Sequence, residues 1–435
     1  MSRRRLLLTG LLLAAGCGHR EPPETPMPAP APPAGAGRVE RPVPPPPTRQ
    51  APVAAPFAGG PEIRIGLQVD VARVTLGGGG ALVVRPASGA SMVIPAGRTA
   101  GVTAERGRLT VEGAEGARSL VAPLTVTPAE QGGFVRVAGR DHRGALELQK
   151  TLAGVTVAVR LSMETYLGGV VAAELGTTDP DALEALKAQA VIARTYAMRN
   201  LGRNRGQGFD LLATVSDQRY DGVAGEQGTA WKALADTKGQ VLTYQGAPID
   251  AFFHSTCGGR TASGAEVFTY ADRPYLRSVS DLDPAGQAWC RASPRFRWEQ
   301  RWDAEALTAA LRKGLDLDAA AAAGVRSIET TRRSPSDRVT QLRVRLRGRD
   351  VVIDGSNAVR RALPPPDLDL LRSAAFTLTY SGDGQHIDQL TVTGQGSGHG
   401  VGLCQWGAIG RARAGRPYAE ILAAYYPGTR LDQRW

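Results

Sequence analysis

Apolar and polar residues alternate along two stretches near the start of the folded part of the chain. The segments EIRIGLQVDVARVTLGG and RGALELQKTLAGVTVAVRL show this alternation, and glycines break the runs. A period of two is typical of strands with one buried face, and glycine is typical of the turns between them. Residues 62–161 are therefore expected to form a twisted antiparallel sheet region.

A helical period follows within residues 164–200. The positions that recur at i, i+4, i+7 and i+11 on one helix face are Met163, Leu167, Val170 and Glu174. The first three are apolar, so the carboxylate of Glu174 is predicted to lie on a buried stripe, where desolvation raises its pKa. A carboxyl group that stays protonated near neutral pH can act as a general acid. Glu164 and Glu184 lie off the apolar faces and are interpreted as ordinary solvated residues.

A second helix is predicted to start at Asp179-Pro180, because aspartate is a favoured N-cap and proline is tolerated at the first helical position. Its buried stripe is formed by Leu183, Leu186, Ala190, Ala193 and Ala197. Lys187 and Arg194 share a neighbouring face of this helix. That face is either a solvated charged surface or the lining of a site, since the run of alanines lets other backbones pack closely.

The elements together predict an α+β fold. An antiparallel β-rich part, residues 62–161, is expected to pack with a helical core made of residues 162–298 and 391–435. Residues 299–390 contain an alanine-rich helix and strands such as VTQLRVRLRG, and they are interpreted as an inserted α/β region.

The N-terminus has the pattern of an export signal. Residues 1–17 contain a basic start, an apolar run too short to span a bilayer, and small residues before Cys17. The sequence LAAGC resembles a bacterial lipobox, so Cys17 is expected to be lipidated. A plain secretory signal is the alternative, and a twin-arginine signal is a weaker match. Residues 18–60 are rich in proline and alanine and are predicted to be a semi-rigid linker.

The charge of the chain is strongly positive. Its 52 lysines and arginines exceed its 41 acidic residues, which gives a formal net charge of +11. Such a surface can attract nucleic acid, anionic lipid or an anionic wall polymer. Export argues against nucleic acid, and no long basic run is interleaved with aromatic residues. The excess is therefore interpreted as a diffuse surface field.

Three polar segments carry further candidate residues. The loop at residues 215–226 holds side chains that can form hydrogen bonds with sugar hydroxyls. A strand then leads to His254-Ser255 and a Gly-Gly pair, which permits close approach of a ligand. The glycine-rich segment around His399 leads into Gln405, but it lacks the GK[ST] ending of a phosphate loop.

The cysteines leave two hypotheses open. With Cys17 assigned to the anchor, Cys257, Cys290 and Cys404 remain, an odd number for an exported chain. Cys257 and Cys290 would form a plausible disulfide in an oxidising compartment. The sharper alternative is a zinc site with the ligands His254, Cys257, His399 and Cys404. The chain has no compact CxxC pair, so no cofactor is expected and zinc is the less favoured alternative.

Several motifs together resemble the SpoIID/LytB family, the sporulation stage II protein D group of cell-wall lytic transglycosylases and amidase enhancers. In the order of the family these are YLGGVVAAEL, EALKAQAVIARTYAM, SDQRYDGV, FHSTCGGRT, YLRSVSD, and GHGVGLCQWGAIGRA with YYPGT. They extend from about residue 143 to residue 431. As a set they are far more specific than any one of them.

The resemblance implies an enzyme that cleaves peptidoglycan glycan strands between N-acetylmuramic acid and N-acetylglucosamine and leaves 1,6-anhydro-muramoyl ends. Glu174 falls on the family's catalytic glutamate, and one carboxyl group suffices as general acid and base. The positions that match the family's polar motifs and are expected to bind substrate are Lys187, Arg194, Gln218, Tyr220, His254, Ser255, His399 and Gln405. Some relatives carry zinc near the turn that begins at His254 and ends at the Gly-Gly pair, called the histidine turn below. The pattern of Cys257 and Cys290 favours a disulfide here.

Two other functions are compatible with the same residues. One is a non-catalytic wall-binding protein that enhances a separate N-acetylmuramoyl-L-alanine amidase. The other is a metallohydrolase that uses His254 and His399 and loses activity with chelators. The expected partners are peptidoglycan glycan strands, a membrane through a lipid anchor at Cys17, and a cell-wall amidase, but no nucleic acid. The protein is thus expected to be an exported lipoprotein of the bacterial cell envelope.

Overall fold

The computed structural model describes residues 59–105, 107–318 and 324–435. The export signal, the lipidation site at Cys17 and all but the last two residues of the linker lie outside the described residues. The described part of the chain has an α+β fold, as the sequence predicts. None of its helices combines the length and the apolarity that a membrane crossing requires.

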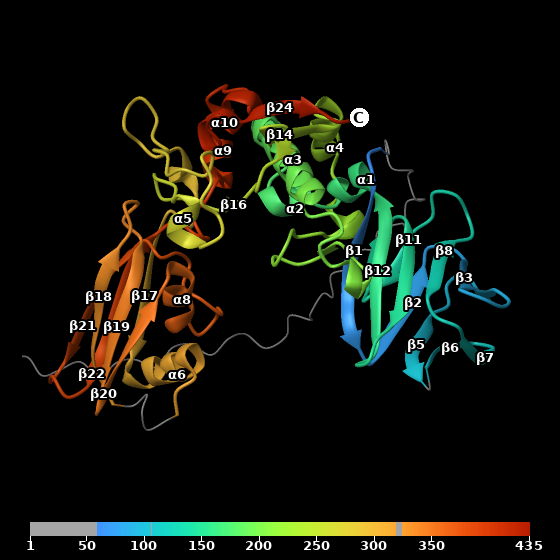
Figure 1. The fold of residues 1–435 in the computed structure, drawn as a ribbon, viewed down its shortest axis with the longest axis horizontal. Helices are drawn as coiled ribbons and strands as arrows, with labels where there is room; N and C mark the ends of the chain where they lie inside the picture. Colours follow the sequence, from blue (N-terminus) through green and yellow to red (C-terminus); the bar gives the residue numbers. More distant parts are fainter. Residues whose placement is uncertain (1–58, 106, 319–323) are drawn as a thin grey trace, which may run out of the picture. The chain divides into compact units, whose positions relative to one another are not determined.

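Residues 62–162 form strands of two sheets (Figure 1). In spatial order, the first sheet contains β13 (Leu211–Leu212), β1 (Glu62–Val71), β12 (Val155–Ser162), β11 (Ala145–Lys150), β8 (Leu124–Pro128), β3 (Leu82–Pro86) and β4 (Met92–Ile94). The second contains β10 (Arg140–His142), β9 (Val135–Val137), β2 (Arg73–Gly78), β5 (Ala100–Glu105), β6 (Arg108–Gly113) and β7 (Gly116–Leu120). Neighbours pair antiparallel, except that β1 and β13 are parallel.

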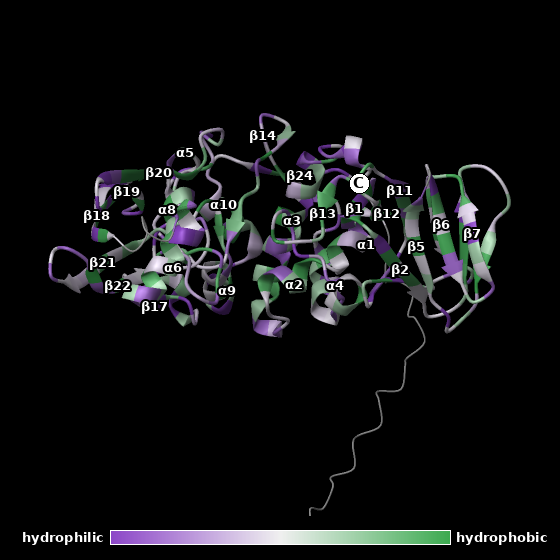
Figure 2. Ribbon diagram, turned by 90° about the horizontal axis from the view of Figure 1, so that it is seen from below, coloured by the Kyte–Doolittle hydropathy of each residue, from purple (hydrophilic) through white to green (hydrophobic). Residues whose placement is uncertain are grey.

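The register of the first sheet explains the alternation in the sequence. One row of paired residues crosses five strands and consists of Ile65, Val159, Leu146, Val126 and Val84. All five side chains are fully buried. A shift of one residue in any strand would move its apolar side chains to the other face, so this row fixes the pairing. Figure 2 shows both hydrophobic and hydrophilic residues in the β-rich part of the chain.

The first predicted helix is divided into two short helices, α1 (Met163–Gly168) and α2 (Val171–Leu175). The sequence suggested one continuous face, but the chain turns at Gly169. A side chain at Gly168 would collide with the ring of Trp231, and one at Gly169 would collide with the ring of Tyr220. The two glycines therefore allow these aromatic rings to pack directly against the helix backbone.

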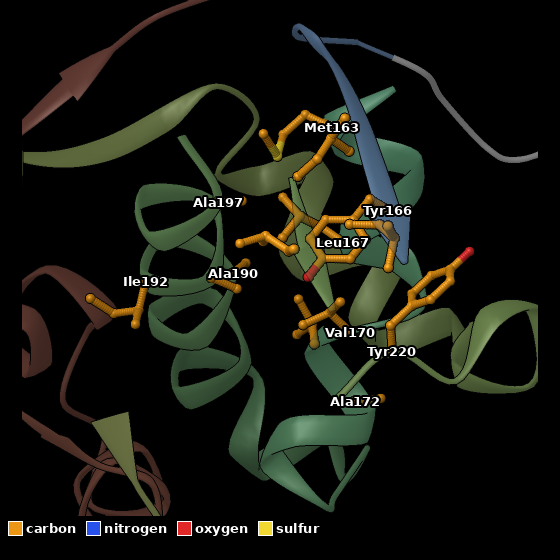
Figure 3. Packing of buried hydrophobic residues seen from close by; sticks show 14 of the residues in the cluster. Met163, Tyr166, Leu167, Val170, Ala172, Ala190, Ile192, Ala197 and Tyr220 are labelled. Atoms are coloured by element: carbon orange, nitrogen blue, oxygen red, sulfur yellow. The ribbon is translucent and has the colours of Figure 1, made fainter. Parts of the chain in front are cut away.

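The second predicted helix begins with a 3-10 turn, η1 (Pro180–Ala182), and continues as α3 (Leu183–Arg199). Four of the five residues of its predicted apolar stripe, Leu186, Ala190, Ala193 and Ala197, are fully buried, and Leu183 at its start is partly buried against the same core. Figure 3 shows Met163, Leu167 and Val170 of the preceding segment packed close to this helix. These side chains belong to one hydrophobic core that also includes both sheets.

The remaining elements complete this core around α3. The helices are α4 (Gly228–Asp236), α5 (Gly264–Val267), α9 (Gln405–Arg413) and α10 (Tyr418–Tyr425), with 3-10 turns η2 (Arg205–Gln207), η3 (Gly222–Gly225) and η4 (Trp289–Ala292). The strands are β14 (Gln240–Tyr244), β15 (Ala247–Pro248) and β24 (Arg430–Gln433) in one small sheet, and the parallel pair β16 (Phe253–His254) and β23 (Leu403–Cys404). The last pair brings the histidine turn beside the start of α9.

A second hydrophobic core is built from residues between Trp302 and Val392. Its strands are β17 (Arg297–Asp303), β22 (Ile387–Gln395) and β21 (Phe376–Gly382) in one sheet, and β18 (Val325–Arg333), β19 (Val339–Leu346) and β20 (Arg349–Asp354) in another. The helices α6 (Ala304–Leu315) and α8 (Ser356–Ala362) contact each other and these sheets (Figure 1).

Candidate active site

A cavity of about 480 Å³ contains Glu174 in its wall. Segments far apart in the sequence contribute to it, including α2, α3, the loop after β13, the histidine turn and the start of α9. The lining residues are Glu174, Tyr196, Asn200, Arg203, Val215, Ser216, Asp217, Asp250, Ala251, Phe252, Phe253, His254, Ser255, Phe268, Tyr270, Gly398, His399 and Gln405. The mixture of carboxylates, amides, imidazoles and aromatic rings suits a polar ligand with apolar faces.

Glu174 is half-buried near the C-terminal end of α2. One of its carboxylate oxygens, Oε1, accepts a hydrogen bond from the backbone N–H of Arg219. Burial raises the pKa of Glu174 to about 7, against the opposing effects of this hydrogen bond and of the nearby Arg219 charge. A raised pKa of this kind favours the protonated form of Glu174 near neutral pH, which is the condition for a general acid.

The other carboxylates of the cavity have cationic partners. Asp217 forms an ion pair with Arg203, and Asp250 forms ion pairs with Arg199 and Arg273. Among the described residues, Glu174 has no such ion pair. The cavity thus provides one carboxyl group that is not held in an ion pair among the described residues.

The two histidines of the cavity lie near each other, with ring centroids 5.6 Å apart. Burial lowers the pKa of His254 well below its usual value and lowers the pKa of His399 to about 3, so both rings are neutral at pH 7. His254 Nδ1 donates a hydrogen bond to the carbonyl oxygen of Val401 at 3.1 Å. Its buried Nε2 has no partner among the described residues and can accept a hydrogen bond from a ligand.

Gln405, the first residue of α9, connects this helix to Glu174. Its Nε2 donates to the backbone carbonyl of Glu174 at 3.0 Å and to Gln189 Oε1 at 3.4 Å. The backbone N–H of Trp406 donates to the carbonyl of Ser255 at 3.0 Å. The start of α9 is therefore tied both to the end of α2 and to the histidine turn.

Aromatic rings form one side of the cavity. Phe252 and Phe268 are stacked with centroids 4.9 Å apart, and Phe268 meets His399 edge-on at 5.4 Å. Tyr270 lies next to Phe268 and is 65% exposed. Such a surface offers apolar faces to the rings of a sugar, and the tyrosine hydroxyl adds a polar contact.

Of the residues predicted to bind substrate, His254, Ser255, His399 and Gln405 line the cavity with Glu174, and four others do not. Arg194 is fully buried and forms a two-pronged ion pair with Glu164, with Nε–Oε1 and Nη2–Oε2 distances of 3.0 and 2.8 Å. The prediction that Glu164 is solvated was therefore wrong. Sequence spacing could not show this pair, because its members lie on different helices.

The other three residues also have partners within the protein. Lys187 forms ion pairs with Glu184 at 2.8 Å and with Asp236 of α4 at 3.0 Å. Gln218 is buried and accepts a hydrogen bond from the hydroxyl of Tyr166 at 3.1 Å. Tyr220 is also buried, with its ring centroid 5.4 Å from that of Tyr166. None of the three residues lines the cavity.

The expected disulfide is not formed, because Cys257, Cys290 and Cys404 are free. The sulfur atoms of Cys257 and Cys290 are 3.6 Å apart, whereas a disulfide bond measures about 2.05 Å. The alternative zinc set is not assembled as expected either. Among the described residues, the group that could hold a metal consists of Cys257, Asp281, Cys290 and Cys404, without the histidines.

The sequence analysis named the loop that supplies Asp217 to the cavity, but it did not name Tyr196, Asp250 or Phe252 as site residues. The hydroxyl of Tyr196 donates to Asp217 at 2.7 Å, and both residues line the cavity. Asp250 and Phe252 enter from the segment just before the histidine turn. Their position two to four residues before His254 was the available signal, since side chains around a strand end gather at one edge.

Comparisons with known proteins identify the family. Residues 152–244 match the family model described as Stage II sporulation protein, SpoIID, and residues 286–402 match a domain of unknown function, DUF8618. Stage II sporulation protein D of Bacillus subtilis is 32% identical over 288 residues, which cover 63% of this chain and 75% of that protein. The chain belongs to the SpoIID family.

Two further proteins are similar to this chain. An uncharacterized protein of Brachyspira hyodysenteriae is 32% identical over 299 residues, which cover 68% of this chain and 74% of that protein. The amidase enhancer of Bacillus subtilis is 29% identical over 279 residues, which cover 57% of this chain but only 38% of the enhancer.

Proposed function

We propose that the protein is a lytic transglycosylase that cleaves peptidoglycan glycan strands between N-acetylmuramic acid and N-acetylglucosamine. Glu174 acts first as general acid and then as general base. The observation that carries this proposal is the carboxyl group of Glu174, which lies in a cavity wall, has a pKa near 7 and has no ion pair among the described residues. The match of Glu174 to the family motif and the polar residues around it also support the proposal.

A single such carboxyl group suits this reaction better than hydrolysis. Most glycosidases need a second carboxylate to activate water or to attack the sugar. Asp217 and Asp250 are engaged in ion pairs with arginines, which makes them poor candidates for that second role. In a transglycosylase, the 6-hydroxyl of the muramoyl residue replaces water, so no second carboxylate is required.

The proton balance of the reaction can be written with Glu174 alone. Its carboxyl group donates a proton to the glycosidic oxygen while the bond from that oxygen to the muramoyl anomeric carbon breaks. The muramoyl 6-hydroxyl oxygen then bonds to the same carbon, and its proton passes to the Glu174 carboxylate. The products are a free N-acetylglucosamine hydroxyl and a 1,6-anhydro-muramoyl end, and the enzyme returns to its protonated state.

The neighbouring side chains bind and position the sugars in this proposal. His254 Nε2 accepts a hydrogen bond from a sugar hydroxyl or acetamido N–H, because its Nδ1 carries the proton. The hydroxyl of Ser255 accepts from or donates to the same kinds of group. Gln405 holds the backbone of Glu174 in place through its 3.0 Å hydrogen bond to the carbonyl oxygen. The faces of Phe252, Phe268 and Tyr270 provide the apolar contact to the sugar rings.

The product distinguishes this reaction from hydrolysis. Purified protein is incubated with glycan strands, both with and without stem peptides, and the new ends are identified by mass spectrometry. We expect anhydro-muramoyl ends, which are one water lighter than the reducing ends that hydrolysis leaves. Reducing ends alone would show a hydrolase, and no cleavage of either substrate would contradict an enzymatic role.

An amidase-enhancer function is the second candidate, and the similarity to the amidase enhancer of Bacillus subtilis favours it. It predicts that the protein binds glycan strands and raises the rate of a cell-wall amidase while forming no anhydro ends. Mixing the wild-type protein or Glu174→Gln with an N-acetylmuramoyl-L-alanine amidase separates the two. Equal stimulation by both proteins would favour the enhancer.

The location proposed for this activity is the bacterial cell envelope. Cys17 would carry the lipid that holds the protein at a membrane, and the proline-rich linker would let the folded part reach the wall polymer. Labelling of cells with a fatty-acid probe tests the anchor. Wild-type protein is expected to be labelled and Cys17→Ala is expected to remain unlabelled, whereas labelling of both would place the lipid elsewhere.

A further inference from the structure

A buried cluster beside the cavity contains three cysteines and one aspartate. The four residues are Cys257, Asp281, Cys290 and Cys404, and their sulfur atoms and a carboxylate oxygen all lie within 4.8 Å of one another. Their exposed fractions are between 0 and 2%. None of the four lines the glycan cavity, so the proposed reaction does not explain why they gather here.

The cluster joins four segments that are separate in the sequence. Cys257 follows β16, and Cys404 ends the paired strand β23 and caps α9. Cys290 lies in η4, and the backbone N–H of Asp281 donates to the carbonyl of Gly259 at 2.9 Å. A ligand shared by these residues would cross-link the histidine turn, the start of α9 and the segment between them.

The spacing of the side chains fits ligands of a metal ion better than a disulfide. In a tetrahedral zinc site with Zn–S distances near 2.3 Å, neighbouring sulfurs are about 3.8 Å apart. The Sγ atoms of Cys257 and Cys290 are 3.6 Å apart, and Cys257 Sγ lies 3.1 Å from Asp281 Oδ2. A disulfide would also leave one thiol of the three unused inside the cluster, whereas a metal uses them all.

The aspartate is oriented as a metal ligand would be. Its Oδ1 accepts hydrogen bonds from the hydroxyl of Tyr425 at 2.7 Å and from Nη2 of Arg411 at 3.1 Å. These bonds leave Oδ2 directed at the cysteines. A side chain at Gly407 would collide with both Tyr425 and Asp281, so glycine makes room for this arrangement. Outer hydrogen bonds of this kind fix the orientation of metal-binding carboxylates.

Backbone N–H groups point at the sulfurs in the same way. Cys404 Sγ accepts from the N–H of Cys257 at 3.1 Å and from that of Gly407 at 3.3 Å. The N–H of Gly259 lies 3.3 Å from Cys257 Sγ. Such donors stabilise negative charge on sulfur, which is the form that binds metals. The arrangement therefore favours thiolates bound to a cation.

We propose that Cys257, Cys290, Cys404 and Asp281 bind one structural zinc ion. Three thiolates and one carboxylate are a ligand set that suits zinc and disfavours magnesium or calcium. Because all four positions are supplied by the protein, the site is closed and has no open position for substrate. The ion holds the histidine turn against the start of α9, since Cys404 immediately precedes Gln405. This inference does not depend on the glycan reaction.

Metal analysis of the purified protein tests the site. The full chain with Cys17→Ala, produced in medium with zinc, is expected to contain about one zinc per chain by elemental analysis and native mass spectrometry. After denaturation with a chelator it should show all three remaining thiols. A protein without zinc that shows a single thiol would contain a disulfide and would overturn the proposal.

Variants define the ligands. Asp281→Asn and Cys290→Ser are expected to lower zinc affinity by about tenfold or more, because each removes one ligand. His254→Ala and His399→Ala are the matched controls, and both should retain full zinc content. Loss of zinc in the histidine variants, with retention in the cysteine variant, would assign the ion to the histidine turn and contradict the proposal.

Replacement of zinc by cobalt tests the same site in the wild-type chain, so it does not require a cysteine variant that folds. The zinc of the wild-type chain is exchanged for Co²⁺, and the absorption spectrum is recorded. Bound thiolates should give intense thiolate-to-cobalt charge-transfer bands together with the visible bands of tetrahedral cobalt. A spectrum that matches aqueous cobalt would show that the cluster binds no such ion.

Discussion

Glu164 of α1 and Glu174 of α2 are neighbouring carboxylates in the sequence with different surroundings. Glu164 is fully buried, but Arg194 contacts both of its oxygens, and the N–H groups of Gly239 and Trp435 also donate to it. Glu174 is only half-buried, yet it has a single backbone donor and no ion pair among the described residues. The comparison teaches that Glu164 has a cationic partner within the protein, whereas burial of Glu174 without an ion pair raises the pKa of its carboxyl group.

Substitution of Glu174 gives the largest expected effect. Glu174→Gln keeps the shape of the side chain but removes the transferable proton, so formation of anhydro ends should fall by about 10²–10⁴-fold. The rate is measured by mass spectrometry of glycan products. Glu420→Gln changes an exposed carboxylate on α10 that does not line the cavity, and it should retain the wild-type rate.

The same variant should not weaken the fold. A carboxyl group whose pKa rises on folding binds more protons in the folded state, so its contribution to stability decreases as pH rises towards 7. At pH 8 the free energy of unfolding of Glu174→Gln should equal that of the wild type or exceed it by about 1–3 kcal/mol. A marked loss of stability in denaturant unfolding would mean that Glu174 has a structural role.

Loss of one partner of the buried Glu164–Arg194 ion pair, unlike Glu174→Gln, should weaken the fold. Arg194→Met leaves the Glu164 carboxylate buried without its cation, and the free energy of unfolding should fall by about 3–5 kcal/mol. The double variant Glu164→Leu/Arg194→Met removes both charges and should recover part of this loss. A stable single variant with reduced glycan binding would instead return Arg194 to the substrate site.

The pH dependence of the reaction follows from the protonation of Glu174. The acid form is required, so kcat/KM for anhydro-end formation should be highest below about pH 7 and fall by about tenfold per pH unit above it. The profile is recorded at constant ionic strength with glycan strands. A rate that stays constant between about pH 6 and 9 would argue against Glu174 as the proton donor.

Lys187 provides the smallest expected effect. Its ion pairs with Glu184 and Asp236 are partly exposed, so Lys187→Met should cost about 1 kcal/mol or less of unfolding free energy. Its rate of anhydro-end formation should match the wild type. A large loss of activity would show that Lys187 contacts the glycan after all.

The sequence predicted features that depend on local periodicity. Alternation identified the strands of residues 62–162, as the buried row through Ile65 and Val159 shows. The helical period found the buried stripe of α3, but it missed the turn at Gly169. That turn depends on Trp231 and Tyr220, which lie far along the chain and fill the space a side chain would occupy.

Local periodicity could not predict contacts between residues that lie far apart in the sequence. The bond between Glu164 and Arg194 joins two helices, and no spacing rule connects their positions. The cysteines were noticed as a group, and Asp281 ends the motif YLRSVSD, but no spacing rule connects this aspartate with the cysteines, which it meets because four segments converge. Motif order located Glu174 and the histidine turn, whereas Tyr196 and Asp250 required the cavity itself.

Titration of Glu174 tests the central claim most directly. The carboxyl carbon resonances of the wild type and of Glu174→Gln are compared by NMR across the pH range, which isolates the signal of this residue. A midpoint near pH 7 is the expected result, because the cavity desolvates the carboxylate and supplies no paired cation. A midpoint near the ordinary value of 4.5 would show that Glu174 is ionised at neutral pH and would contradict its role as the proton donor.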